Sequence, residues 1–285
     1  MLFRSHEDVF LHSLKRKLGA DEPVFGVNWF EAVAYCRWLS REAGNAHSRV
    51  FTDDDEAIRY AHWLARRLGR CDASRPGHVA VLLENHPELV GLLAACAYNG
   101  MTLFGINTGL RGDTLSGVLN QSRARLLVVD ERFWPEVERV RDRLGQIPAE
   151  NIAVLRTRGE EELGGADFEE CVSREVGKAG SDLEPPPGPV SPDSNLMVIY
   201  TSGTTGLPKG IKNSHAKLLL IGSTVARRME LGPDDVGYAC MPLFHSNSLF
   251  LGFQPVFDAC GTLSDRKSTR LNSSHSSVSR MPSSA

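Results

Sequence analysis

A regular alternation of short apolar runs with longer segments of helical period most constrains what this chain can fold into. Between Phe51 and Leu155, apolar runs of four to six residues predict buried strands, and the segments between them carry apolar residues every three or four positions. Strands separated by helices pair mostly in parallel, because each helix returns the chain to the starting end of the sheet. We therefore expect an α/β fold with largely parallel sheets flanked by helices.

The same pattern predicts the individual elements. The expected strands are His78–Leu83, Met101–Ile106, Leu126–Asp130, Ile152–Leu155 and Leu196–Tyr200. The expected helices are Asp53–Leu68, Pro87–Tyr98, Asp113–Gln121 and Phe133–Leu144. Asn99-Gly100 closes the second helix, since glycine readily adopts the left-handed conformation that ends a helix. Charged and proline-rich stretches at Glu160–Glu162 and Glu184–Pro192 are expected to form a solvent-exposed connection.

Composition and charge exclude several classes of partner. The net charge is −3 with both signs mixed along the chain, which favours neither nucleic acid nor an acidic membrane surface. Apolar runs such as Leu92–Ala97 are far shorter than a membrane-spanning helix. The six cysteines form no C-x-x-C pair and no Cys/His metal spacing, so free thiols are favoured over disulfides or a zinc site. These features predict a cytoplasmic protein without a transmembrane segment, a metal site or nucleic-acid binding.

A glycine-rich polar loop follows the strand expected at Leu196–Tyr200. Thr201–Gly210 reads TSGTTGLPKG, and its glycines let the backbone turn tightly and approach a ligand. The hydroxyls and backbone N–H groups can surround an anion, and Lys209 adds a positive charge suited to phosphate oxygens. It is not a Walker A loop, because that motif needs lysine directly after glycine and here Leu207-Pro208 intervene. The loop predicts a pyrophosphate-binding site.

Several segments carry a family resemblance. Tyr200–Gly210 (YTSGTTGLPKG) resembles the signature loop of the adenylate-forming, or AMP-binding, superfamily of acyl-CoA synthetases, luciferases and peptide-synthetase adenylation domains. Val79–Ala94 is similar to an early βα unit of that superfamily. Asn107–Asp130 and Met241–Ser248 resemble the fatty-acid-transport-protein and very-long-chain acyl-CoA synthetase subgroup. The resemblance covers residues 51–264 and implies an incomplete N-terminal AMP-binding domain.

The resemblance also assigns site residues. It implies that the ATP phosphates are wrapped by Thr201, Ser202, Gly203, Thr204, Thr205, Gly206 and Lys209. His245, in Pro242-Leu-Phe-His245, is implied to line the acyl pocket beside the reacting carboxylate, so Lys209 and His245 are the expected catalytic residues. Taken alone, a histidine at an apolar strand end fits a structural role better, and the surrounding motif reverses that preference. His215 is interpreted as a structural residue that begins the next helix, and Asn85 and Asn107 as turn residues rather than ligands.

The implied reaction has two halves. A fatty acid or other carboxylate attacks the α-phosphorus of ATP to give an acyl-adenylate and pyrophosphate, with Mg²⁺ and cations neutralising the developing charge. Coenzyme A then displaces AMP to give a thioester, so ATP, Mg²⁺ and coenzyme A are the expected cofactors and substrates. The resemblance also implies that the full-length enzyme can contact a membrane peripherally.

Three parts of the family pattern do not appear in the sequence after Ser264. They are a Tyr-Gly-x-Thr-Glu segment whose glutamate helps to hold Mg²⁺, an aspartate for the ribose hydroxyls, and a C-terminal domain carrying the adenylation lysine. We therefore expect the 285-residue chain to be inactive on its own. The alternative interpretation is a non-catalytic nucleotide-binding module that keeps the loop for binding or regulation.

The remaining segments resemble other sources. Met1–Ser5 and Asp265–Ala285 resemble translated sequencing adapters, and the second is a serine- and arginine-rich stretch expected to be a disordered tail. Residues 6–47 contain PVFGVNWFEAVAYCRWLSREAG, which resembles a fragment of the formylglycine-generating (sulfatase-modifying) family without its catalytic cysteine region. The sequence thus predicts a chimaera, with an adapter-like scar at 1–5, a foreign fragment at 6–47, the AMP-binding segment at 51–264 and an adapter-like tail at 265–285.

Overall fold

A central seven-stranded sheet organises the molecule. The computed structural model describes residues 54–69, 77–156, 165–176, 190–201 and 208–264. The strand order is β5-β4-β3-β1-β2-β6-β7, and every neighbouring pair is parallel except β6 and β7, which are antiparallel. This confirms the expected α/β fold with a largely parallel sheet.

The elements have the following bounds. The strands are β1 (His78–Leu82), β2 (Thr102–Gly105), β3 (Leu126–Asp130), β4 (Ile152–Leu155), β5 (Ala166–Asp167), β6 (Asn195–Thr201) and β7 (Lys209–Ser214), and β8 (Val236–Tyr238) pairs with β9 (Thr262–Ser264) in a separate parallel ribbon. The helices are α3 (Asp54–Leu68), α4 (Pro87–Asn99), α5 (Gly112–Ser122), α6 (Trp134–Val140), α7 (Phe168–Val176), α8 (His215–Arg228) and α9 (Gln254–Asp258). Short 3₁₀ turns lie at Glu131–Phe133, Arg141–Arg143 and Ala149–Asn151, and a π-helix lies at Ser248–Phe253.

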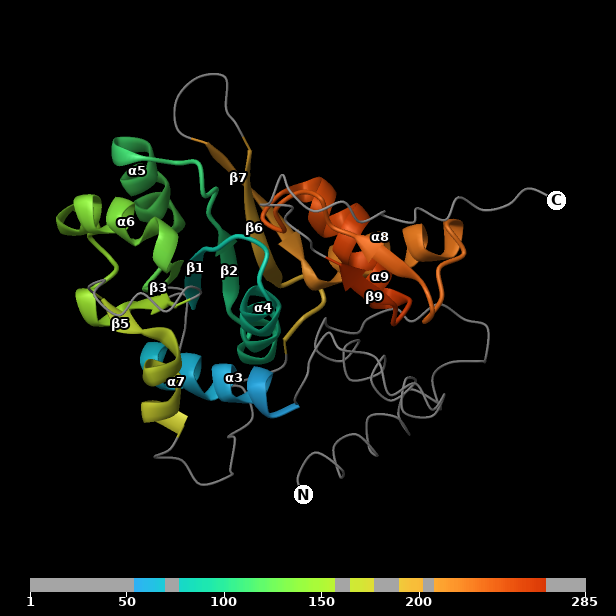
Figure 1. Cartoon of the computed structure of the whole chain (residues 1–285), viewed down its shortest axis with the longest axis horizontal. Helices are drawn as coiled ribbons and strands as arrows, with labels where there is room; N and C mark the ends of the chain where they lie inside the picture. The colour runs from blue at the N-terminus through green and yellow to red at the C-terminus, as the bar shows by residue number, and fades with distance from the viewer. Residues whose placement is uncertain (1–53, 70–76, 157–164, 177–189, 202–207, 265–285) are drawn as a thin grey trace, which may run out of the picture.

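Helices cover both faces of the sheet. In β1, Val79 and Val81 join a core formed with α3, α4, α7, α8 and α9, whereas Ala80 and Leu82 join a second core formed with α5 and α6. Figure 1 shows α5 and α6 at the left of the sheet and α8 and α9 at its right. Both cores are apolar because strands buried on both faces carry continuous apolar runs. Among the helices described, none is both long enough and apolar enough to cross a membrane.

Local sequence signals set several boundaries. Gly100 has φ +64°, and the Met101 N–H donates to the Cys96 carbonyl at 2.8 Å, so the predicted end of α4 is confirmed. The helix expected over Phe133–Leu144 is wrong in part, because α6 is flanked by 3₁₀ turns. The Asp130 carboxylate accepts a hydrogen bond from the Arg132 backbone N–H, which favours a tight turn directly after β3.

The two stretches expected to form a solvent-exposed connection lie largely outside the described residues, and between them the chain forms elements that the prediction missed. These elements are β5 and α7, and the Phe168 ring is fully buried. Its centroid is 5.1 Å from that of Tyr60 and 5.3 Å from that of Trp63, both edge-on. α7 therefore packs against α3, and its buried residues Phe168, Cys171 and Val172 follow a helical period that the prediction did not use.

Candidate active site

The carboxyl ends of β1, β2 and β6 form one edge of the sheet. Glu84 and Asn85 follow β1, Asn107 follows β2, and β6 ends at Thr201 where the glycine-rich loop begins. In open α/β sheets the ends of parallel strands share an edge, and ligands bind outside it. The candidate site therefore belongs to this edge.

The two ends of the glycine-rich loop are cross-strand neighbours. Thr201 pairs with Lys209 across β6 and β7, and the Thr201 hydroxyl donates to the Lys209 carbonyl at 3.3 Å. Both side chains are exposed. The other loop residues predicted to bind phosphate lie outside the described residues, namely Ser202, Gly203, Thr204, Thr205 and Gly206. Lys209 was predicted to lie in the loop, but it is the first residue of strand β7.

The face of Thr201 follows from alternation along β6. Ile199 belongs to the core on the α4 and α8 side, and Tyr200 packs on the α5 and α6 side, so Thr201 lies on the same face as Ile199. The Tyr200 hydroxyl donates to the Val118 carbonyl at 3.4 Å, and burial raises the pKa of Tyr200 to about 12. Tyr200 thus anchors the strand end, whereas Thr201 is exposed at the edge.

His245 lies on a tight turn rather than at a strand end. Its backbone N–H donates to the Pro242 carbonyl at 2.8 Å, and its carbonyl accepts from the Leu249 N–H at 3.0 Å in the π-helix that follows. The imidazole is exposed, whereas the preceding Phe244 is buried. The turn therefore leaves His245 at the surface and is anchored by the buried side chain of Phe244.

Gly105 brings this turn to the same edge as the loop. A Cβ added at Gly105 would lie 2.9 Å from the Phe244 Cβ and 3.0 Å from the Met197 Cε. Gly105 in turn pairs with Ile199, two residues before Thr201. Phe244 therefore packs directly on the end of β2, and His245 and Thr201 belong to neighbouring positions of one edge.

We predict that Gly105→Ala destabilises the protein by about 1–2 kcal/mol, because the added methyl group would overpack a filled site. Gly145→Ala is the matched control, since a Cβ there meets no atom within 4 Å. Urea unfolding monitored by tryptophan fluorescence measures both variants. Equal stabilities of the two variants would contradict the close packing of Phe244 on β2.

Asn85 binds the turn that carries His245. Its Nδ2 donates to the Met241 carbonyl at 3.0 Å, and its Oδ1 accepts from the Leu243 N–H at 2.6 Å. As interpreted, Asn85 lies in the bend between β1 and α4, but its side chain also contacts a segment far away in the sequence, which the interpretation did not predict. For Asn107 the same interpretation is confirmed: its Oδ1 accepts from the Gly109 N–H at 2.8 Å.

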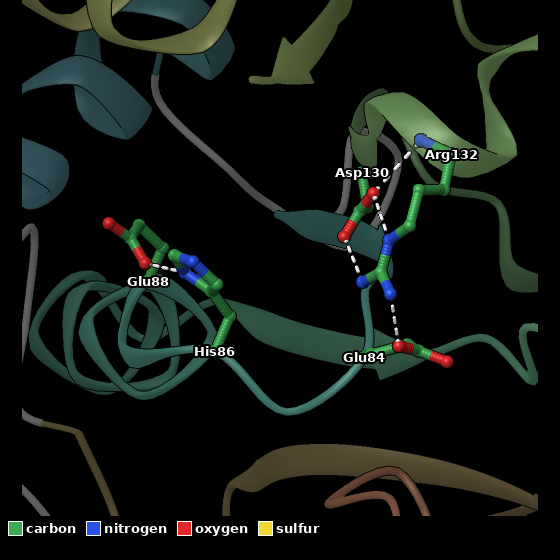
Figure 2. Close-up of polar contacts among 5 residues, drawn as sticks. All are labelled: Glu84, His86, Glu88, Asp130 and Arg132. Atoms are coloured by element: carbon green, nitrogen blue, oxygen red, sulfur yellow. Dashed lines mark hydrogen bonds and ion pairs between the residues drawn. The ribbon is translucent and has the colours of Figure 1, made fainter. Parts of the chain in front are cut away.

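A cluster of ion pairs lies at the ends of β1 and β3 (Figure 2) and includes Glu84, the residue directly before Asn85. The Arg132 Nε and Nη2 donate to the two oxygens of Asp130 at 2.8 and 2.5 Å, and Nη1 donates to Glu84 Oε2 at 2.5 Å. Asp130 is 1% exposed. The hydrogen bond with Asp130 raises the pKa of Arg132 above its ordinary value, so the guanidinium stays charged. No sequence motif marked this cluster, although Glu84, Asp130 and Arg132 all follow or end buried strands.

His215 is the first residue of α8, which confirms its predicted position. Ser214 precedes it as the N-cap and accepts a hydrogen bond from the Lys217 N–H at 3.2 Å. The imidazole is fully buried, and desolvation lowers the pKa of His215 to about 4. It is therefore neutral at pH 7 and belongs to the core rather than to the edge.

We predict that His215 makes the free energy of unfolding depend on pH. Between pH 6.5 and about 4 the unfolded chain binds a proton that folded His215 does not, so this residue makes stability fall as pH falls, by up to about 1.4 kcal/mol per pH unit. Burial raises the pKa of Asp258 to about 6, which acts in the opposite sense between about pH 4 and 6. Urea unfolding of His215→Asn and the unsubstituted chain should therefore be compared at each pH. A difference in stability that stays constant from about pH 7 to about pH 4.5 would contradict the buried neutral imidazole.

The described residues contain no group of three or more His, Cys, Asp or Glu side chains arranged to hold a metal ion.

The sequence matches the family described as AMP-binding enzyme over residues 54–269. A medium/long-chain-fatty-acid–CoA ligase, FadD17 of Mycobacterium marinum, is 31% identical over 198 residues, which are 70% of this chain and 35% of that protein. The FadD17 ligase of Mycobacterium tuberculosis is 32% identical over 200 residues, with the same two shares. The chain thus spans about a third of the length of these relatives.

Solved structures share the fold. A red-emitting luciferase from Phrixothrix hirtus superposes with a TM-score of 0.69 at 21% identity, over 88% of this chain and 62% of that one. The anthranilate CoA ligase AuaEII, in complex with anthranoyl-AMP, superposes with a TM-score of 0.67 at 22% identity, over 86% of this chain and 46% of that one. At these identities the likeness establishes the fold.

Proposed function

The chain belongs to the AMP-binding enzyme family, and from this premise we propose that it is part of an acid–thiol ligase that activates a fatty acid with ATP and transfers the acyl group to coenzyme A. The single observation that carries the proposal is the convergence of the loop ends and the His245 turn on one edge of the sheet. The names of the mycobacterial relatives support a fatty acid as the carboxylate. A long or very long acyl chain is the substrate class we propose.

The glycine-rich loop is proposed to hold the phosphates of ATP. The residues in this role are Thr201, Ser202, Gly203, Thr204, Thr205, Gly206 and Lys209. The pairing of Thr201 with Lys209 supports it, because the backbone then brings a hydroxyl and an ammonium group to the same place. Both side chains are exposed, so an anion can reach them without first opening the core.

His245 is proposed to line the pocket for the carboxylate. Its exposed imidazole stands on a turn anchored by buried Phe244, at the edge where β6 delivers Thr201. A carboxylate held by His245 would lie toward the loop, which is the arrangement that attack on an ATP phosphorus requires. A side chain on an anchored turn keeps its geometry better than one on an unsupported loop.

The proposed chemistry conserves charge and atoms in two displacements. A carboxylate oxygen bonds to the α-phosphorus while the bond to the β-phosphate oxygen breaks, which gives an acyl-adenylate and pyrophosphate. The sulfur of coenzyme A then bonds to the acyl carbon, its proton is lost and AMP leaves. ATP carries Mg²⁺ as its counter-ion in solution. The chain contributes orientation and preorganised charge, which together lower the barrier to each displacement.

The proposal assigns the function to residues 51–264, as an incomplete N-terminal AMP-binding domain. Residues 1–5 and 265–285, which resemble translated adapters, and residues 6–47, which resemble a formylglycine-generating fragment, are proposed to contribute nothing to it. All three segments lie outside the described residues. Sequencing the flanking genomic DNA tests this division: an uninterrupted natural reading frame through all four segments would refute it.

Carboxylate-dependent exchange of labelled pyrophosphate into ATP tests the function. Residues 54–264 should be joined to the remaining part of a related ligase, because the chain spans about a third of its relatives. We expect exchange that depends on an added fatty acid. Saturable ATP binding without fatty-acid-dependent exchange would instead support the non-catalytic nucleotide-binding module.

A further inference from the structure

Glu84 and Asn85 stand between two parts of the molecule that are far apart along the chain. On one side Glu84 accepts from Arg132, which Asp130 holds at the end of β3 (Figure 2). On the other side the Asn85 amide donates to the Met241 carbonyl and accepts from the Leu243 N–H, in the segment that leads to His245. Two adjacent residues at the end of β1 thus contact both β3 and the His245 turn.

The ion pairs fix the position of this short segment. Asp130 is buried, and its carboxylate accepts hydrogen bonds from both the backbone N–H and the side chain of Arg132. Arg132 is therefore held both at its backbone and at its guanidinium group. A planar guanidinium bound to two carboxylates has little freedom. Glu84 is therefore held in one position. Because Asn85 is the next residue, the direction in which the chain leaves β1 at Asn85 is fixed as well.

The turn itself depends on Asn85. The Leu243 N–H, in a residue that is 3% exposed, donates to Asn85 Oδ1 at 2.6 Å. The Met241 carbonyl accepts from Asn85 Nδ2 and from the Ser248 hydroxyl at 2.7 Å. No hydrogen bond to the His245 imidazole occurs within the part of the chain that the structure describes. The backbone of the turn therefore sets where the imidazole lies.

We propose that Asn85 is a positioning residue for the carboxylate half of the site: it holds the 241–245 turn so that His245 stands at the edge of β2 and β6. The proposal rests on the function proposed above and adds a residue to it. Asn85 acts through the turn and touches no substrate. Its loss should affect the carboxylate and leave ATP binding unchanged, because Thr201 and Lys209 are held by the β6–β7 pairing instead.

The first test uses the 285-residue chain and nuclear magnetic resonance. In Asn85→Ala we expect the Leu243 amide to exchange about tenfold faster, the scale of one buried hydrogen bond, and the His245 ring signals to shift. Asn107→Ala is the matched control, since Asn107 follows the neighbouring strand and its side chain bonds only locally. Unchanged Leu243 exchange and His245 signals in Asn85→Ala would overturn the proposal.

A conservative variant separates positioning from folding. Asn85→Asp keeps an acceptor for Leu243 and loses the donor to Met241, whose carbonyl retains the Ser248 hydroxyl. Leu243 exchange should therefore stay slow while the His245 signals move only part of the way. If Asn85→Ala fails to fold, Asn85→Asp decides: His245 signals identical to those of the unsubstituted chain would overturn the proposal.

The second test uses the joined ligase and pyrophosphate exchange. Asn85→Ala should raise KM for the fatty acid by about ten- to a hundredfold and should leave KM for ATP unchanged. An equal rise in KM for ATP and in KM for the fatty acid would overturn the positioning role. If the unsubstituted ligase shows no fatty-acid-dependent exchange, the proposed function fails, and the resonance spectra still decide whether Asn85 places His245.

Discussion

Replacing Lys209 with alanine should slow adenylate formation by about ten- to a thousandfold in a ligase that contains this segment, the scale seen when one electrostatic donor leaves a preorganised site. Lys209 is exposed beside Thr201 at the start of β7, where its charge can meet the phosphates as the α-phosphorus is attacked. The second half-reaction, begun from synthetic acyl-adenylate, should be nearly unchanged because pyrophosphate has already left. Pre-steady-state measurement of each half-reaction reports the two rates separately.

Lys212→Ala is the matched control for Lys209. It removes a lysine from the same strand, but Lys212 pairs with Val198 whereas Lys209 pairs with Thr201, so the two side chains lie on opposite faces of β7. We expect Lys212→Ala to keep both half-reactions. If Lys209→Ala slowed both halves equally in a folded protein, the assignment of the loop to pyrophosphate would be wrong.

Replacing Asp130 with alanine should lower the free energy of unfolding by about 3 kcal/mol, because it leaves Arg132 partly buried without its main partner. Asp130 accepts three hydrogen bonds from Arg132, one of them from the backbone. Urea unfolding of the purified chain at neutral pH measures the loss.

Two comparisons make the Asp130 prediction specific. Glu136→Ala breaks a more exposed ion pair with Arg139 and should cost less than about 1 kcal/mol. The double variant Asp130→Leu/Arg132→Met should be more stable than Asp130→Ala, since it removes the guanidinium together with the buried carboxylate and leaves only Glu84, whose side chain is more exposed than that of Asp130. A single variant as stable as the unsubstituted chain would show that the cluster does not support the sheet.

The sequence was most informative where strands are buried on both faces. β1, β3 and β4 were predicted at nearly their observed bounds, because Val, Leu, Ile and Ala make up all but the first residue of β1 and the last residue of β3. β7 was missed for the opposite reason. Its residues KGIKNS are mostly exposed at the end of the sheet, so no apolar alternation marks them.

The two short strands β8 and β9 were also missed. Val236 and Tyr238 are exposed, and each strand has three residues, which is too short for a period to be visible. Their pairing joins segments well apart in the chain. Only the folded arrangement of the segments between them brings the two together.

The candidate site shows the same division. The loop and His245 stand out in the sequence as local motifs, although their roles remain predictions. Asn85 and the Glu84–Arg132–Asp130 cluster do not stand out, because their roles depend on contacts with residues far away in the sequence. An asparagine directly after a buried parallel strand was the available signal, since such positions lie at the ligand-binding edge.

The antiparallel pairing of β6 with β7 has a consequence for how the site is assembled during folding. Thr201 and Lys209 are only eight positions apart, whereas the pairing of β6 with β2 joins Met197 to Leu103, ninety-four positions away. Contacts between near neighbours form with little loss of chain entropy, and distant ones form late. We therefore expect the β6–β7 hairpin to bring the two ends of the glycine-rich loop together before the parallel sheet is complete. The backbone on either side of the loop would then be paired before β6 pairs with β2.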